Sequence, residues 1–137
     1  MRNLAVIMLL FIGISSCSMF KKKPVRATDL KLFKDTPVWD AVKALYNHEY
    51  EEATLFFEES PDLINYQEKR FYQTILLWAV KNEMVGIVDF MLELEADTEL
   101  KDRYGIYPII QASHHKDPYL LKLLIKDRPQ CVYYPIT

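Results

Sequence analysis

Three histidines and two pairs of adjacent glutamates come nearest to a catalytic or metal-binding set in this chain. His114 and His115 are sequence neighbours, so on a helix their side chains point in different directions, whereas a two-histidine metal grip uses the i, i+4 spacing. We therefore expect no metal, and we expect His114 and His115 to lie at a solvated helix end. His48 is expected in a loop between two helices.

The glutamate pairs Glu51-Glu52 and Glu58-Glu59 flank an amphipathic segment, and are typical of the wet side of a helix. The chain holds only three glycines, no glycine-rich phosphate loop, and no serine in a nucleophile elbow. We expect no catalytic residues, no cofactor and no small-molecule substrate. The sequence therefore predicts that the protein is not an enzyme.

The N-terminus has the parts of a secretory signal. Arg2 supplies a positive charge, Leu4 to Ile14 form an apolar run, and Ser15 and Ser16 supply small residues before a cleavage point. A membrane-spanning helix needs about 20 apolar residues, so we expect residues 1–16 to be a signal peptide that is removed.

Ile14-Ser15-Ser16-Cys17 resembles the lipobox of bacterial lipoproteins. The resemblance implies that Cys17 carries lipid and anchors the protein to the cell envelope, facing the periplasm. Ser18, where an aspartate often retains such proteins in the inner membrane, favours the outer membrane. The alternative is an ordinary signal peptide with an incidental Cys17.

Cys131 is the second of the two cysteines in the chain. Lipidation of Cys17 leaves it without a disulfide partner, and two cysteines so far apart do not form a paired zinc site. Cys131 is interpreted as a small buried hydrophobe, with a reactive thiol as the alternative.

Residues 17–28 are expected to be the lipidated cysteine and a polar tether to a domain at 29–137. The three lysines at 21–23 are expected to approach anionic lipid headgroups. Once Arg2 is removed with the signal, 16 Lys and Arg face 19 Asp and Glu. This mildly acidic balance does not favour a nucleic-acid surface.

An internal repeat of about 33 residues organises the rest of the chain. Segment 74–79 precedes its counterpart at 107–112, and segment 69–72 precedes 102–105. An earlier unit fits at an offset of about 35 residues, which places Ala44 before Ala79. Each unit has two apolar patches at helical spacing, so the sequence predicts short helices whose faces are buried by stacking.

These units resemble ankyrin repeats. The matches in two units are Asp102, Gly105, Pro108, Ile109 and Ala112, and Thr74, Leu76, Ala79, Ile87-Val88, Met91-Leu92 and Ala96-Asp97. The resemblance covers about residues 36–130 and implies an all-α solenoid of about three helix-turn-helix repeats, at about 36–68, 69–101 and 102–134.

The chain also departs from the ankyrin pattern. Leu77 and Ile110 replace two family histidines, so we expect plain apolar packing at both positions. Glu83 and Lys116 replace a glycine between helices, and Tyr72 replaces a turn glycine, so these turns are expected to be strained or differently shaped. Residues 131–137 either fold back over the last helix pair or mark a truncated chain.

In ankyrin domains the partner usually lies on the concave side. The residues carried over as partner-binding are Arg70, Phe71, Gln73, Lys81, Asn82, Arg103, Tyr104, Ile106, His114 and His115. Arg70-Phe71 and Arg103-Tyr104 repeat a basic-aromatic pair of the types favoured at binding hot spots. The alternative is that both aromatic rings pack within the hairpin layer and both arginines are merely solvated.

A small lipid-anchored binding module facing the periplasm resembles immunity lipoproteins that neutralise toxic effectors. We therefore expect one protein partner, bound at nanomolar or tighter affinity, and a role as an immunity or inhibitor protein. The alternative is a scaffolding or structural lipoprotein of an envelope complex, with weaker and more numerous partners.

Overall fold

The computed structural model describes residues 23–127, and within that range every regular element is helical, which confirms the expected all-α class. Three helix pairs follow one another along the chain: α2 (Trp39–Tyr46) with α3 (Tyr50–Glu59), α4 (Ile75–Lys81) with α5 (Val85–Glu93), and α6 (Pro108–Ser113) with α7 (Tyr119–Asp127). Two short 3-10 turns, η1 (Leu30–Phe33) and η2 (Pro61–Leu63), precede and follow the first pair.

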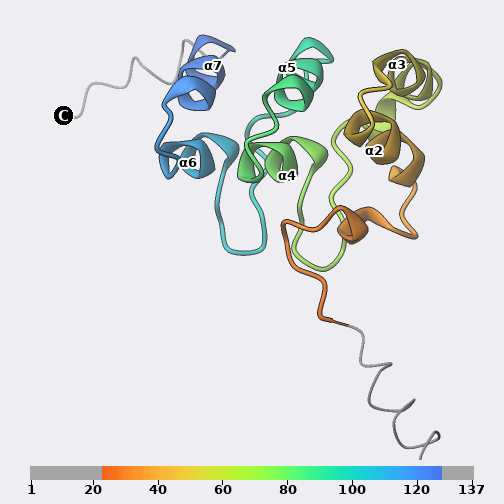
Figure 1. Cartoon of the computed structure of the whole chain (residues 1–137), viewed down its shortest axis with the longest axis horizontal. Coiled ribbons are helices and arrows are strands. Elements are labelled where there is room, and N and C mark those ends of the chain that lie inside the picture. Colours follow the sequence, from red (N-terminus) through yellow and green to blue (C-terminus); the bar gives the residue numbers. More distant parts are fainter. Residues whose placement is uncertain (1–22, 128–137) are drawn as a thin grey trace, which may run out of the picture.

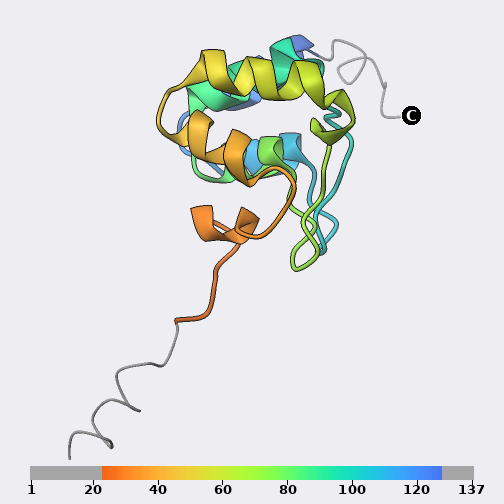
Figure 2. The ribbon, with the colours of Figure 1, turned by 90° about the vertical axis from the view of Figure 1, so that its right-hand side faces the viewer.

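The helix pairs stand side by side in two rows (Figure 1). α2, α4 and α6 form one row, and α3, α5 and α7 form the other. The loops that join successive pairs extend beyond the α2–α4–α6 row, on the side away from the other row, and the N-terminal segment lies toward that side too (Figure 2). The outer turns of these loops therefore lie beyond α2, α4 and α6, away from α3, α5 and α7 (Figure 2).

Helix α4 lies in the middle of the core. All six residues from Ile75 to Val80 are buried, as expected for a helix that is apolar on every side and packs between neighbours. The hydroxyl oxygen of Thr74 accepts a hydrogen bond from the backbone N–H of Leu77 at 3.0 Å and caps the start of the helix. Leu77 is 1% exposed, which confirms the apolar packing expected there.

Left-handed residues end several of the helices. His48 (φ 64°) follows α2, and Glu83 (φ 55°) follows α4. In each case the next backbone N–H reaches back to a carbonyl five residues earlier, as in a Schellman motif: Glu49 to Ala44 at 2.8 Å, and Met84 to Ala79 at 2.9 Å. The strained turn expected at Glu83 is confirmed, whereas Lys116 does not take a positive φ.

The N-terminal segment packs on the helices earlier than the expected tether boundary at residue 28. The indole N–H of Trp78 donates to the backbone oxygen of Thr28 at 3.1 Å, and the ring of Phe33 meets the Trp78 ring edge-on at 5.7 Å. Val25 also packs against the core. This attachment follows from the buried indole, because its N–H needs an acceptor.

Several expectations lie outside the described residues. These are the signal peptide, Cys17, Lys21 and Lys22, Cys131, and the alternatives for residues 131–137. Among residues 23–127, no helix combines the length and apolar character needed to cross a membrane.

Candidate functional site

The candidate site is the surface formed by the two loops between helix pairs, called here loop A (residues 67–74) and loop B (residues 101–107), with the C-terminal ends of α4 and α6. We call this surface the loop face. Both loops turn back on themselves through a backbone hydrogen bond: Glu68 N–H to the Gln73 oxygen in loop A, and Asp102 N–H to the Ile106 oxygen in loop B, each at 3.0 Å. Every partner-binding residue predicted from the sequence lies on this face or just behind it.

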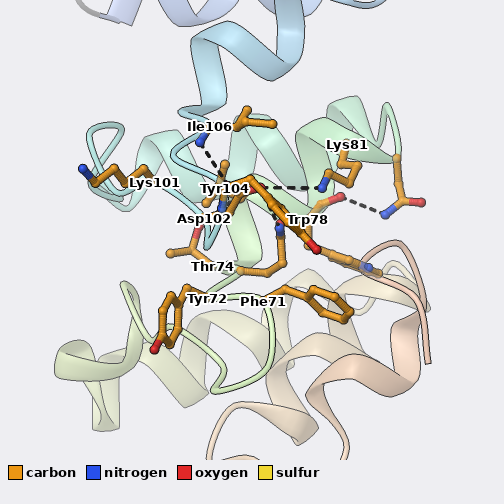
Figure 3. Close-up of polar contacts among 12 residues, drawn as sticks. Phe71, Tyr72, Thr74, Trp78, Lys81, Lys101, Asp102, Tyr104 and Ile106 are labelled. Atoms are coloured by element: carbon orange, nitrogen blue, oxygen red, sulfur yellow. Dashed lines mark hydrogen bonds and ion pairs between the residues drawn. The ribbon is translucent and has the colours of Figure 1, made fainter. Parts of the chain in front are cut away.

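A buried carboxylate organises loop B. Asp102 is 4% exposed, and its Oδ1 accepts hydrogen bonds from the backbone N–H groups of Tyr104 at 2.8 Å and Ile106 at 3.0 Å (Figure 3). Gly105 takes the left-handed conformation (φ 78°) that closes the turn. The loop is therefore fixed by its own acid, and the backbone around Tyr104 is rigidly placed.

Loop A is built in the same way around Glu68, not around the Lys69 that the repeat offset aligned with Asp102. Glu68 is 2% exposed; its Oε2 accepts from the N–H of Arg70 at 2.6 Å, and its Oε1 accepts from Phe71 at 2.7 Å and Gln73 at 2.9 Å. Loop A has one more residue than loop B between the acid and the residue that closes it. The longer side chain of glutamate spans the larger turn.

The two loops are joined through a buried polar link. The side-chain amide of Gln73, fully buried, donates from Nε2 to Oδ2 of Asp102 at 3.3 Å. Lys81, on the last turn of α4, places Nζ 3.8 Å from the same oxygen, with its side chain only 18% exposed (Figure 3). Gln73 and Lys81 thus hold the loops from within, although the sequence assigned them to the binding surface.

Arg103 is also occupied within the loop layer. Its backbone N–H donates to the Phe71 oxygen at 2.9 Å, its guanidinium lies 5.1 Å from the centre of the Tyr72 ring, and an Nη donates to the Lys69 oxygen at 3.4 Å. Gln67 adds a bridge from loop A, since its Nε2 donates to the oxygens of Tyr72 and Lys101 at 3.0 Å. Loops A and B therefore form one continuous layer.

Among the predicted residues, Arg70, Arg103, Tyr104 and His114 are exposed, and of these Arg103 is held within the loop layer. Tyr104 is 69% exposed, and Arg70 and His114 are exposed as well. Phe71 is half-buried and packs against the core, so the alternative of an aromatic residue packed in the loop layer holds for Phe71 but not for Tyr104. Ile106 is half-buried and serves loop B through its backbone.

Asn82 and His115, at the ends of α4 and α6, make hydrogen bonds within the protein. Asn82 is half-buried and its side-chain N–H₂ donates to the Trp78 oxygen at 2.9 Å, at the end of α4. His115 does not lie at a solvated helix end as expected. Its Nε2 is 2.7 Å from the Val80 oxygen and its Nδ1 is 3.3 Å from the Glu83 carboxylate, so the ring joins α6 to α4.

The sequence analysis missed three exposed side chains, two on the loop face and one on α6. Tyr72 is 46% exposed, Tyr107 37% and Ile110 46%, so the expectation of buried apolar packing at Ile110 was wrong. Ile110 lies in the last described helix pair, where no further pair covers α6 (Figure 1). Tyr72 holds φ 56°, at a position where the sequence predicted a strained or differently shaped turn.

Within residues 23–127, no group of three or more His, Cys, Asp or Glu side chains is placed to hold a metal ion. Comparison of the chain with protein-family models and with curated proteins gives no match.

Proposed function

We propose that this protein is not an enzyme and binds another protein through its loop face. The observation that carries the proposal is that exposed side chains stand on loops whose backbone is held in place by hydrogen bonds. Arg70, Tyr72 and Tyr104 project from backbone that two buried acids hold in place. Such a surface loses little conformational entropy on binding, and tyrosine and arginine supply large contact areas.

We further propose that the three helix pairs are ankyrin-type repeats. Their support is the 33-residue spacing, the helix pairs at successive positions, and loops that each close around a buried acid at the start of the repeat. In this arrangement the loop face is the concave side of the domain.

The proposed setting is the bacterial envelope, with lipid on Cys17 and the domain in the periplasm, at the outer membrane. Its support is the sequence Ile14-Ser15-Ser16-Cys17 after an apolar run. A rigid binding module in that place suits a protein that neutralises a toxic effector by occupying its surface. We therefore propose an immunity or inhibitor role.

The test of partner binding is a capture experiment from envelope extract with the mature protein as bait. Arg70→Ala/Tyr104→Ala removes two exposed side chains that do not hold the loops, and Tyr119→Ala/Lys122→Ala removes the same kinds of side chain from α7, in the other row of helices. We expect one stoichiometric partner, lost with the loop-face variant and kept with the α7 variant. If both variants keep the partner, the loop face is not the binding surface. Several weak partners would instead favour scaffolding.

Anchorage is tested separately. Wild-type protein should sediment with membranes and yield an N-terminal peptide whose mass includes acyl chains on Cys17. Cys17→Ser should remain unprocessed or appear without lipid. Recovery of the wild type as an unacylated protein with an ordinary signal cleavage would refute the anchor and leave the loop-face proposal intact.

A further inference from the structure

A groove lined by cations lies between the N-terminal segment and loop A. Its positively charged lining residues are Lys23, Lys31, Lys34, Lys69 and Arg70, and all five side chains are exposed. We call these residues the basic groove. They stand out because the chain as a whole carries a net charge of −2.

The three carboxylates of the groove lining form no ion pair with its five cations. Glu68 is buried, and both of its oxygens accept backbone hydrogen bonds. The remaining acids of the lining are Asp29, which accepts from the Arg26 N–H at 2.9 Å, and Asp35. In the described part of the chain, the ion pairs are Asp40–Lys43, Lys81–Asp102 and Glu83–His115, none of which includes a cation of the groove.

The size of the groove indicates a surface and not a small molecule. It encloses about 1340 Å³ and is open to solvent, which exceeds the roughly 300–1,000 Å³ of typical small-ligand pockets. Three of its cations come from the N-terminal segment and two from loop A, and a set of charges from two separate segments suits many phosphate groups in a layer.

The position of the groove indicates that the surface it contacts is a membrane. Lys23, a lining residue, is six positions after Cys17, and six extended residues span about 20 Å. The N-terminal segment and loop A lie on the same side of the molecule, away from α3, α5 and α7 (Figure 2). If Cys17 is lipidated, Lys23 stays within about 20 Å of the bilayer, so the groove can enter the layer of about 10 Å in which the potential of anionic lipids acts.

We propose that the basic groove docks the domain on anionic phospholipid headgroups and so orients it on the membrane. The proposal rests on the proposed lipid anchor for its geometry; it does not require the proposed partner, but the two share Arg70, so docking and partner binding compete for loop A. Each lysine near an anionic leaflet strengthens attachment about fivefold, so several act together to make docking stable.

The test is hydrogen exchange of the full lipidated protein on two kinds of vesicle, one containing phosphatidylglycerol and one of phosphatidylcholine alone. Amides of segments 23–35 and 66–70 should exchange about tenfold more slowly on the anionic vesicles, and high salt should remove the difference. Lys31→Glu/Lys34→Glu/Lys69→Glu should abolish this protection. The matched variant Lys116→Glu/Lys122→Glu/Lys126→Glu, with the same change in net charge, should keep it.

Equal exchange on both vesicle types, or equal loss in both triple variants, would overturn the docking proposal. Thermal melts of the two variants establish that each is folded. Failure of the anchor is seen separately, as protein that stays in solution with phosphatidylcholine vesicles. In that case binding to anionic vesicles that only the groove variant loses would still support docking, whereas no binding to them would refute it.

Discussion

The side-chain amide of Gln73 donates to Oδ2 of Asp102 at 3.3 Å, and both residues are buried between loops A and B. The same carboxylate also receives two backbone N–H groups through Oδ1 and lies 3.8 Å from Nζ of Lys81. One acid therefore fixes the shape of its own loop and the position of that loop against its neighbour.

We predict that Asp102→Ala lowers the free energy of unfolding by about 3 kcal/mol, because it leaves two N–H groups, the Gln73 amide and the Lys81 ammonium without their acceptor. Urea denaturation measures the change. Asp97→Ala is the control, since exposed Asp97 accepts a single backbone N–H, from Glu99 at 2.8 Å; its cost should stay below about 1 kcal/mol. Similar losses in the two variants would contradict the assigned role of Asp102.

The match between acid length and loop length gives a second prediction. Glu68→Asp should cost about 1–2 kcal/mol, because a side chain shorter by one methylene cannot reach the N–H groups of Arg70, Phe71 and Gln73 together. Deleting Lys69 in the Glu68→Asp background shortens the loop to the length of loop B. That double change should recover at least half of the lost stability; a further loss would show that acid length and loop length are unrelated.

The packing between α3 and α5 gives a third prediction. A Cβ added at Gly86 would stand 2.6 Å from the hydroxyl oxygen of Tyr50. Glycine to alanine in a helix normally stabilises by about 0.5–1 kcal/mol, but here we expect Gly86→Ala to destabilise by about 1 kcal/mol. In a Tyr50→Phe background, which lacks the hydroxyl, the same substitution should become neutral or stabilising. A double-mutant cycle from thermal melts measures the coupling, and additive effects would rule out the contact.

The residues that follow the helices give a fourth prediction. His48 holds φ 64°, so His48→Gly should raise the free energy of unfolding by about 0.5–1 kcal/mol through relief of backbone strain. Lys116 was aligned with the same kind of position but lacks a positive φ. Lys116→Gly should therefore lower stability by a similar amount, since it only adds freedom to the unfolded chain. Melting temperatures that move in the same direction for both variants would contradict this distinction.

The sequence predicted the helix pairs well because their apolar spacing repeats. Aligning Ala44 with Ala79 placed α2 opposite α4 in the pattern, and both residues are buried in those helices. The turns were harder to predict. The repeat offset put Lys69 opposite Asp102. The residue that accepts the backbone N–H groups of loop A, as Asp102 does in loop B, is instead Glu68, one residue earlier and with a longer side chain. A change in side-chain length that offsets a change in loop length is invisible to a fixed spacing.

The arrangement of the loop face was predicted only in outline. A position on the loop face does not reveal whether a side chain points outward, and Gln73 and Lys81 turn inward because the buried Asp102 carboxylate needs donors. His115 likewise turns toward two acceptors on α4 and its following turn. Ile110 is exposed on α6, which packs on α4 and α7 but has no further helix pair beyond it in the described chain, a fact of tertiary context and not of its own sequence window.

The hydrogen bond from Trp78 to the Thr28 oxygen also has a mechanical consequence. The N-terminal chain is fastened to α4, in the middle helix pair, and not only to the first pair that follows it in sequence. Tension applied at the N-terminus is therefore divided between the first and second pairs. Peeling α2 away from the end of the domain requires the Trp78 contact to break as well, which protects the domain from unravelling helix by helix under load.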